Sequence, residues 1–198
     1  MRLPITALII LCLAGPPAFA QEAAAPAPAP ARSSMMDRVI NGIHVNSYAV
    51  YGPGQTSQIL ESTVQGGHAL RVDVAAAGAH PWDVGAGSVT TKPIARGDVL
   101  LLAVWLRAER LPQGAATAAI NIRLQGTAAP YPEIAAASVA VGPEWKLYFA
   151  QTVAASDFAA GQAGATVQLA TASQTIDLGP VFIFDLGPDY DRSTLPTN

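Results

Sequence analysis

Hydrophobic and polar residues alternate with a period of two in many short stretches of the chain, and the longest run covers residues 97–109. Successive side chains of a β-strand point to opposite faces, so this alternation favours a strand over a helix. One face of the run is wholly apolar, and the other changes from apolar to polar. We therefore expect a central strand that is buried on one face and partly covered on the other. The first face carries Leu100, Leu102, Val104, Leu106 and Ala108, and the second carries Val99, Leu101, Ala103, Trp105, Arg107 and Glu109.

Shorter strands are predicted on both sides of this run, because breaks rich in glycine or proline separate apolar stretches of strand length. No segment has the pattern of a long amphipathic helix. Roughly eight or more short strands in one domain predict an all-β fold, a sandwich or a barrel, and a jelly-roll β-sandwich of two antiparallel sheets fits best. The predicted strands cover residues 48–51, 58–62, 68–75, 80–91, 117–125, 134–141, 145–153, 165–171 and 175–186.

The polar sides of these strands form rows of hydrogen-bonding groups. In the strand at 117–125, Asn121, Arg123 and Gln125 alternate with apolar residues, and Gln168 is placed in the same way on a later strand. Any exposed sheet face has such alternation, so each row by itself indicates solvated surface. In the strand at 145–153 the same reasoning places Trp145, Leu147 and Phe149 inward and Lys146 and Tyr148 outward.

The first 35 residues have the features of an export signal and a linker. Residues 1–20 comprise a short basic start, an apolar run and an Ala-x-Ala ending, so we expect a signal peptide that is cleaved after Ala20. The apolar run is too short to span a bilayer comfortably, and no membrane insertion is expected. Alternating proline and alanine at 21–35 indicate a semi-rigid linker or a disordered leader. We expect a domain at 36–187 and a tail at 188–198, in a secreted or periplasmic protein.

Cysteine content and charge narrow the class of function. The single cysteine, Cys12, lies within the predicted signal peptide, so no disulfide is expected in the domain. Removal of Arg2 with the signal leaves 10 of the 11 basic residues against 14 acidic ones, a formal charge of −4. Nucleic-acid-binding surfaces are normally basic, so no nucleic acid is expected as a partner.

No pattern of catalytic or metal-binding residues stands out. Glycosidases generally need two carboxylates on either side of a cleft, and the spacing of Asp83 and Glu133 does not mark them as such a pair. His44, His68 and His80 lack metal-ligand spacing. The sequence therefore predicts no catalytic residues, no cofactor and no metal ligands.

The order of motifs between residues 66 and 187 resembles the carbohydrate-binding modules of families 4, 9 and 22, which are galactose-binding-like jelly rolls appended to bacterial xylanases and other glycanases. The motifs are ALRVDV at 69–74, PWDV at 81–84, the strand from GDV at 97–99 to WLRA at 105–108, PEWKLY at 143–148 and IDLGPVFIFDLG at 176–187. The resemblance implies a non-catalytic protein that binds a polysaccharide or oligosaccharide, with a glycanase as an expected partner in trans.

The resemblance also implies where a sugar would bind. Trp82 and Tyr131 would form an aromatic clamp, since pyranose rings present apolar C–H faces that stack on aromatic planes. Polar side chains nearby would bind the hydroxyl groups. The alternative is that Trp82 belongs to the core or a sheet edge and that Tyr131 caps a loop. The expected ligand-binding residues are Trp82, Tyr131, Arg123, Gln125, Asn121, Asp83 and Gln168.

Two departures from the family pattern bear on function. Relatives often have a glutamine where this chain has Gly85, which removes a contact to a sugar hydroxyl. The segment NGIHV at 41–45 lacks the glutamate that helps relatives to bind structural calcium, so no calcium is expected and Asp185 is interpreted as a surface residue.

We expect a ligand of the xylan or β-glucan type. The alternatives are a structural or accessory β-sandwich of a cell-surface or periplasmic assembly, and a module that has lost its ligand.

Overall fold

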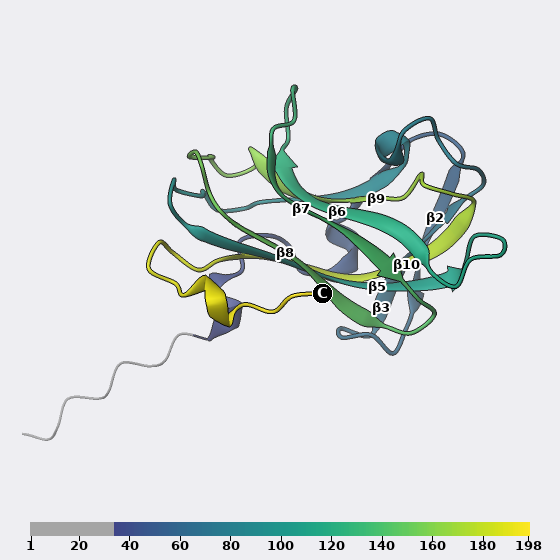
Figure 1. Cartoon of the computed structure of the whole chain (residues 1–198). Coiled ribbons are helices and arrows are strands. Elements are labelled where there is room, and N and C mark those ends of the chain that lie inside the picture. The colour runs from purple at the N-terminus through teal and green to yellow at the C-terminus, as the bar shows by residue number, and fades with distance from the viewer. Residues whose placement is uncertain (1–33) are drawn as a thin grey trace, which may run out of the picture. The chain divides into compact units, whose positions relative to one another are not determined.

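The structure, a computed structural model, describes residues 34–198, which form ten β-strands and four 3₁₀ helices (Figure 1). The predicted signal peptide and nearly all of the predicted linker lie outside the described residues. No helix within 34–198 is long and apolar enough to cross a membrane. The strands are β1 (Ala49–Tyr51), β2 (Gln55–Glu61), β3 (His68–Val74), β4 (Gly85–Val89), β5 (Val99–Arg110), β6 (Ala118–Gly126), β7 (Glu133–Val141), β8 (Lys146–Val153), β9 (Ala163–Gln168) and β10 (Gln174–Asp185). The helices are η1 (Met35–Arg38), η2 (Val45–Ser47), η3 (Pro81–Asp83) and η4 (Arg192–Thr194).

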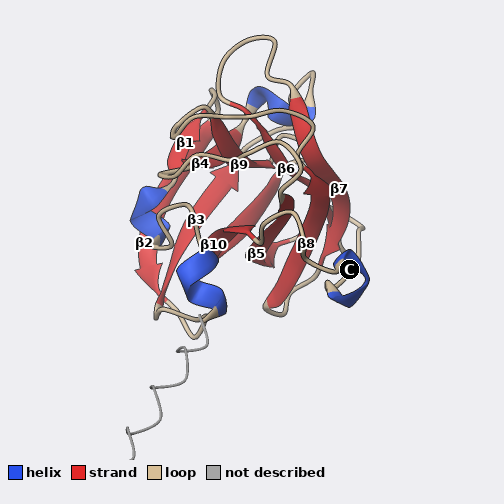
Figure 2. Cartoon of the chain, turned by 90° about the vertical axis from the view of Figure 1, so that its left-hand side faces the viewer, coloured by secondary structure: helices blue, strands red, loops and turns tan. Residues whose placement is uncertain are grey.

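The strands form two five-stranded sheets that face each other as a sandwich (Figure 2). Sheet 1 has the strand order β1-β4-β9-β6-β7, and sheet 2 has the order β2-β3-β10-β5-β8. All strand pairs are antiparallel. This architecture confirms the predicted all-β sandwich of two antiparallel sheets. The longest predicted strand is β5, which lies between β10 and β8.

The core lies between the inner faces of the two sheets. On β5, Leu100, Leu102 and Val104 are each at most 1% exposed, so the predicted inward face of this strand is confirmed. The inward face of β6 is confirmed in the same way, because Ile120 and Ile122 are buried while the residues between and beside them are less so. A period of two therefore identifies the inner faces of both strands.

The outer face of sheet 2 carries a second apolar cluster, to which the segments before β1 and after β10 contribute. The segment expected as a tail at 188–198 packs here, since Leu195 is 7% exposed and the Asn198 side chain bonds the backbone of Phe149. The predicted partial covering of the second face of β5 is thus confirmed. The buried members of this cluster are Val39, Val99, Leu101, Ala103, Phe182, Phe184, Leu186 and Leu195.

The prediction for β8 was wrong. Tyr148, expected outside, is 3% exposed in the main core, and its hydroxyl donates a hydrogen bond to the Ala140 carbonyl at 2.9 Å. Leu147 and Phe149, expected inside, pack against the second cluster on the outer face of sheet 2, and Trp145 is only half-buried. Apolar side chains are covered on both faces of this strand, so their size does not mark the inner face.

The remainder of the outer face of sheet 2 carries a compensated group of charges. Asp177 on β10 is 0% exposed, and its carboxylate accepts hydrogen bonds from Arg71 Nε at 2.7 Å and Arg107 Nη2 at 2.6 Å. Glu109 pairs with the same two arginines at 2.8 and 2.9 Å. Two positive and two negative charges therefore cancel on the surface of this sheet.

One buried amide joins the segment before β1 to both sheets. Asn41 Nδ2 donates to the Ser88 hydroxyl of β4 at 3.2 Å and to the Val181 carbonyl of β10 at 3.0 Å. Its Oδ1 accepts a hydrogen bond from the Ile183 backbone at 2.7 Å. The motif at 41–45, singled out in the sequence for calcium, therefore contributes a structural asparagine.

Candidate functional site

The outer face of sheet 1 carries a row of residues that crosses all five strands. The register pairs Tyr51 with Gly85, Gly85 with Gln168, Gln168 with Asn121, and Asn121 with Ser138. Directly paired residues of neighbouring strands point to the same face of a sheet. Because Ile120 and Ile122 point into the core, Asn121 and the rest of the row lie on the outer face. We call these five positions the transverse row.

Two hydrogen bonds hold the middle of the transverse row. The Ser138 hydroxyl donates to Asn121 Oδ1 at 2.7 Å, and Asn121 Nδ2 donates to Gln168 Oε1 at 3.4 Å. Gln168 is only 3% exposed although it lies on an outer face. The predicted outward direction of Asn121 and Gln168 is confirmed, and their neighbours hold both amides in place. Polar groups held in this way are pre-organised for a ligand.

A hollow of about 290 Å³ opens beside these amides. Arg123, the next outward residue of β6, donates from Nη2 to Glu133 Oε2 at 2.5 Å. Its Nε is buried and has no hydrogen-bond partner within residues 34–198. The hollow therefore combines amide, hydroxyl, carboxylate and guanidinium groups, which together can donate and accept hydrogen bonds with sugar hydroxyls. It is lined by Asn121, Arg123, Glu133, Ala136, Ala137, Ser138 and Gln168.

Trp82 lies in η3, at the end of sheet 1 where β4 begins. The Ala170 backbone donates to the Pro81 carbonyl at 3.0 Å, which ties this turn to the end of β9. Trp82 is 50% exposed, so it is not a core residue. Asp83 Oδ2 accepts a hydrogen bond from the His80 backbone at 2.9 Å. This hydrogen bond helps to close the turn that carries Trp82.

Tyr51 is an aromatic residue of this face that the sequence reasoning missed. It is 40% exposed and lies at the Trp82 end of the sheet, because the backbone of Gly52 packs against the backbone of Asp83. A Cβ at Gly52, whose φ is 98°, would collide with the Asp83 carbonyl, so only glycine brings these segments together. Burial raises the pKa of the Tyr51 hydroxyl further above neutral pH, and the protonated hydroxyl can donate a hydrogen bond.

The ring of Tyr51 occupies the space that a side chain at Gly85 would need. A Cβ added at Gly85 would lie 2.5 Å from Tyr51 Oη. The missing side chain at position 85, noted in the sequence as the loss of a polar contact, is thus filled by a different polar group. The only local sign of this in the sequence is an aromatic residue at the end of a short strand, followed by glycine.

The predicted clamp between Trp82 and Tyr131 does not form around one sugar ring. Tyr131 lies in the β6–β7 loop, at the end of the sheet where Gly126 pairs with Ala163, whereas Trp82 lies beyond the opposite end of β9. The five-residue distance from Ala163 to Gln168 alone spans about 16 Å along the strand. Tyr131 is 54% exposed with a φ of 54°, and Gln125 lies on its side of the sheet.

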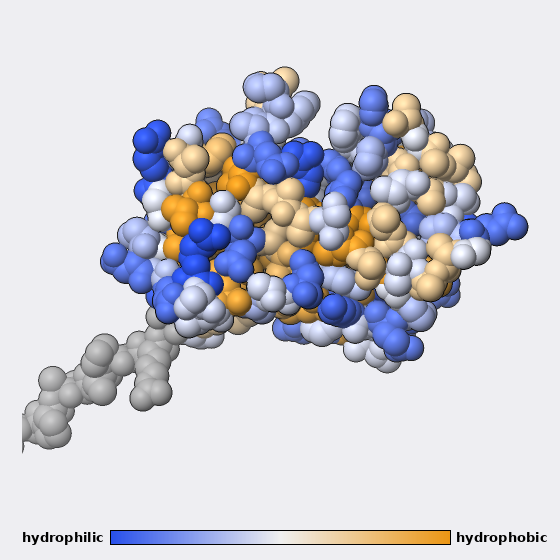
Figure 3. Space-filling view, in the orientation of Figure 1, coloured by the Kyte–Doolittle hydropathy of each residue, from blue (hydrophilic) through white to orange (hydrophobic). Residues whose placement is uncertain are grey.

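Figure 1 shows that both η3 and the β6–β7 loop rise above the outer face of sheet 1. In the space-filling view, the upper edge of the molecule is indented between these two projections, and hydrophilic residues occupy the indentation (Figure 3). The candidate site is therefore a polar trough on sheet 1, with Trp82 and Tyr51 at one end and Tyr131 at the other.

The carboxylates of the trough are engaged separately. Glu133 pairs with Arg123, and Asp83 accepts the hydrogen bond from the His80 backbone at the opposite end of the sheet. In residues 34–198 there is no group of three or more His, Cys, Asp or Glu side chains that could hold a metal ion. The trough therefore has the groups to bind a polar ligand, and these two carboxylates do not face each other across it.

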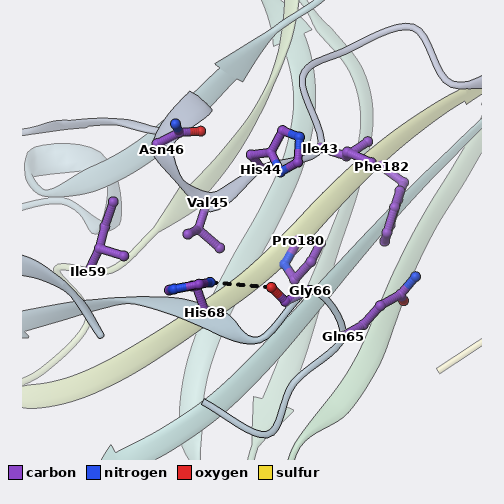
Figure 4. Close-up of a pocket in the computed structure, with 10 residues that line it drawn as sticks. All are labelled: Ile43, His44, Val45, Asn46, Ile59, Gln65, Gly66, His68, Pro180 and Phe182. Atoms are coloured by element: carbon purple, nitrogen blue, oxygen red, sulfur yellow. Dashed lines mark hydrogen bonds between the residues drawn. The ribbon is translucent and has the colours of Figure 1, made fainter. Parts of the chain in front are cut away.

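A second hollow, of about 350 Å³, lies on the other side of the molecule, against sheet 2 (Figure 4). It is mostly apolar, and two histidines, His44 and His68, lie among its residues. His68 Nδ1 is 3.3 Å from the Gly66 carbonyl. None of the residues expected to bind ligand lines this hollow. Its lining is Ile43, His44, Val45, Asn46, Ile59, Gln65, Gly66, His68, Pro180 and Phe182.

Comparison with known proteins gives matches at the level of structure. No family model matches the chain, and a search of curated protein sequences finds no match. A solved structure described as "CBM4 structure and function" superimposes with a TM-score of 0.55 and 19% identity, over 71% of this chain and 95% of that one. The CBM22-1 xylan-binding domain of Paenibacillus barcinonensis Xyn10C gives a TM-score of 0.51 and 13% identity, over 76% and 92%.

A third structure comprises the CBM22-1 and GH10 modules of Clostridium thermocellum xylanase 10B in complex with xylohexaose. The match has a TM-score of 0.54 and 14% identity and covers 81% of this chain but 30% of that one. Identities this low show likeness of fold alone. In its fold, the chain is structurally similar to CBM4 and to the CBM22 carbohydrate-binding modules of xylanases.

Proposed function

We propose that the protein is an exported, non-catalytic carbohydrate-binding protein whose ligand is a β-linked polysaccharide of the xylan or β-glucan type. The observation that carries the proposal is the transverse row: a Ser138–Asn121–Gln168 hydrogen-bond chain that continues through Gly85 to Tyr51 on an open sheet face. Likeness in fold to xylan-binding modules supports it.

In this proposal, the aromatic residues and the amide residues of the site have different tasks. Tyr51 and Trp82 offer partly exposed aromatic surface, and the apolar face of a pyranose ring stacks on such surface. Asn121 and Gln168 bind ring hydroxyls, since each amide can both donate and accept hydrogen bonds. Arg123 contributes its guanidinium at the floor of the hollow. Tyr131 and Gln125, at the far end of the trough, contact a different sugar unit of the same chain.

The absence of catalysis is part of the proposal. A glycosidase places two carboxyl groups on either side of the scissile bond, and in this trough Glu133 is paired with Arg123 while Asp83 shapes a turn. The protein would then act by holding polysaccharide, with a glycanase acting on it in trans. Export by cleavage near Ala20, to the periplasm or beyond, would bring the protein to such a ligand.

Affinity electrophoresis of the full chain through gels that contain soluble xylan, mixed-linkage β-glucan or an α-glucan tests the proposal. We expect retardation by a β-linked polymer and none by the α-glucan. Trp82→Ala should remove the retardation, because loss of a stacking ring costs about 1.5–3 kcal/mol. Ile59→Ala is a matched control, as Ile59 is 49% exposed on sheet 2 and Trp82 is 50% exposed.

The competing function is that of an accessory protein in a surface assembly, and the apolar hollow on sheet 2 favours it. The same experiment separates the two. Migration unchanged by every polysaccharide in the panel would reject carbohydrate binding through this trough and leave the accessory role.

A further inference from the structure

The indole of Trp82 lies against a second ring. The imidazole of His80 stacks on it, with ring centroids 4.6 Å apart and planes inclined by 11°. Stacked rings at this separation are in contact, so no sugar fits between them. Since Trp82 is 50% exposed while His80 covers one face, its exposed surface is the opposite face and the ring edge.

The backbone of a tight turn holds the two rings together. The His80 N–H donates to Asp83 Oδ2 at 2.9 Å, and the Asp83 N–H donates to the His80 carbonyl at 3.1 Å. Pro81, between the rings in sequence, has a fixed φ. The bond from the Ala170 backbone to the Pro81 carbonyl anchors the turn to sheet 1. The orientation of the stack relative to the transverse row is therefore set by the backbone of this turn.

We propose that His80 is a positioning residue for the ligand: it fixes the plane of the Trp82 indole and restricts Trp82 to stacking a single sugar ring, on the face away from the imidazole. This inference rests on the proposed function. An exposed tryptophan side chain that is free to rotate loses conformational entropy when it binds, and a neighbour that already holds the ring removes part of that cost. His80 acts through Trp82 and does not itself contact the sugar.

The role of His80 in this inference is that of a flat ring rather than of a nitrogen donor. A phenyl ring at position 80 can stack on the indole equally well, whereas a methyl group cannot. The exchange of His80 for phenylalanine or alanine therefore separates the stacking from every role that needs an imidazole nitrogen.

The test uses the full chain, with xylohexaose and cellohexaose as probes and isothermal titration calorimetry as the measurement. Circular dichroism first establishes a temperature at which every variant is folded. We expect His80→Ala to weaken binding about three- to tenfold, and His80→Phe to bind within about twofold of the parent. Trp82→Ala is measured in parallel as the reference for loss of the stacking ring.

The outcomes distinguish the inference from the proposed function. If Trp82→Ala loses binding while His80→Ala binds as the parent does, the role of His80 is overturned and the proposed function stands. Equal weakening by His80→Ala and His80→Phe also overturns it, because the imidazole nitrogens would then be the required groups. A parent that binds neither probe, or a Trp82→Ala variant that binds as the parent does, overturns the proposed site and this inference with it.

Discussion

The two sheets differ most on their outer faces. Much of the outer face of sheet 2 is covered, by an apolar cluster shared with the segments before β1 and after β10 and by the ion pairs around Asp177, although an apolar hollow lies against β2 and β10. The outer face of sheet 1 is open, with glycines, the hydrogen-bonded amides of the transverse row and exposed aromatic side chains. The inner faces of both sheets form one shared core. Folding therefore does not require either outer face to be exposed to solvent. In the proposed function, the outer face of sheet 2 contributes to stability and the outer face of sheet 1 binds the ligand.

Two charged side chains, Asp177 on sheet 2 and Arg123 on sheet 1, differ in how fully their hydrogen-bonding atoms are paired. On sheet 2, the buried Asp177 carboxylate has all its charge matched by two arginines. On sheet 1, Arg123 Nε is buried without a partner within the described part of the chain, beside an open hollow. A matched charge offers nothing to a ligand, whereas an unmatched donor has an unused hydrogen bond.

Among variants of the two outer faces, Asp177→Ala is expected to lower the free energy of unfolding most. It removes the buried carboxylate and leaves Arg71 and Arg107 paired with the more exposed Glu109, and breaking a buried ion pair costs about 3–5 kcal/mol. Chemical denaturation measures the loss. Asp73→Ala is the control, since its pair with Arg110 has side chains 46% and 45% exposed and should contribute less than about 1 kcal/mol. Equal losses for the two variants would show that the network around Asp177 is not special.

Leu101→Ala should come next, with a loss of about 2–4 kcal/mol. Leu101 is 3% exposed on the outer face of sheet 2, so its truncation leaves a cavity in the second cluster. Gln125→Ala, on the outer face of sheet 1, should change the free energy of unfolding by less than about 0.5 kcal/mol. The contrast between the faces fails if urea midpoints shift alike in both variants.

Asn121→Ala should act on binding rather than on stability. Its amide links Ser138 to Gln168 by hydrogen bonds. Loss of this amide should weaken polysaccharide affinity about tenfold, the equivalent of one good hydrogen bond. The melting temperature should fall by no more than a few degrees. A variant that melts at a much lower temperature but binds like the parent would show that these hydrogen bonds stabilise the fold and do not bind ligand.

The smallest effect is expected at Asp185. Burial raises the pKa of this carboxyl, and the nearby Asp98 adds to the shift. A pKa raised by folding means that the folded state holds the proton more tightly, so stability falls as the pH rises through that range. Asp185→Asn should therefore stabilise the protein at pH 7 by less than about 1 kcal/mol. The gain should vanish below the ordinary pKa of aspartate. Thermal melts of both proteins at pH 7 and at a pH below that pKa measure it, and a gain that is the same at both pH values would contradict the prediction.

Much of the fold followed from the sequence because most strands have one buried face. The outward positions of Asn121, Arg123 and Gln125 could be predicted, since apolar neighbours on β6 marked the other side. The same rule failed for Tyr148, because apolar residues cover both faces of β8 and the pattern no longer distinguishes them. The resemblance to a known family gave the order of strands but not which aromatic residues lie near each other.

The sequence predicted individual residues of the candidate site but not how these residues lie relative to one another. Trp82 and Tyr131 were expected to contact a sugar, Trp82 from within a predicted strand at 80–91, and both are exposed, but their separation depends on the pairing of β4 and β6 with β9. Tyr51 was missed because its neighbours, Gly85 and Asp83, lie more than thirty residues away in the sequence. Contacts of that kind depend on strand register, which local alternation does not encode.

The buried amide of Asn41 also sets how the protein ages. Asn41 precedes Gly42, a pair in which the glycine nitrogen attacks the side-chain carbonyl, releases ammonia and leaves aspartate or isoaspartate after hydrolysis of the ring. In the folded chain the amide is 8% exposed and its nitrogen and oxygen are both hydrogen-bonded, so it is held in place. Each unfolding event releases it, and a carboxylate in its place could no longer donate to the Val181 carbonyl and would bury a charge. We therefore expect deamidation at Asn41 to make unfolding irreversible on prolonged heating, at a rate set by the time that the chain spends unfolded.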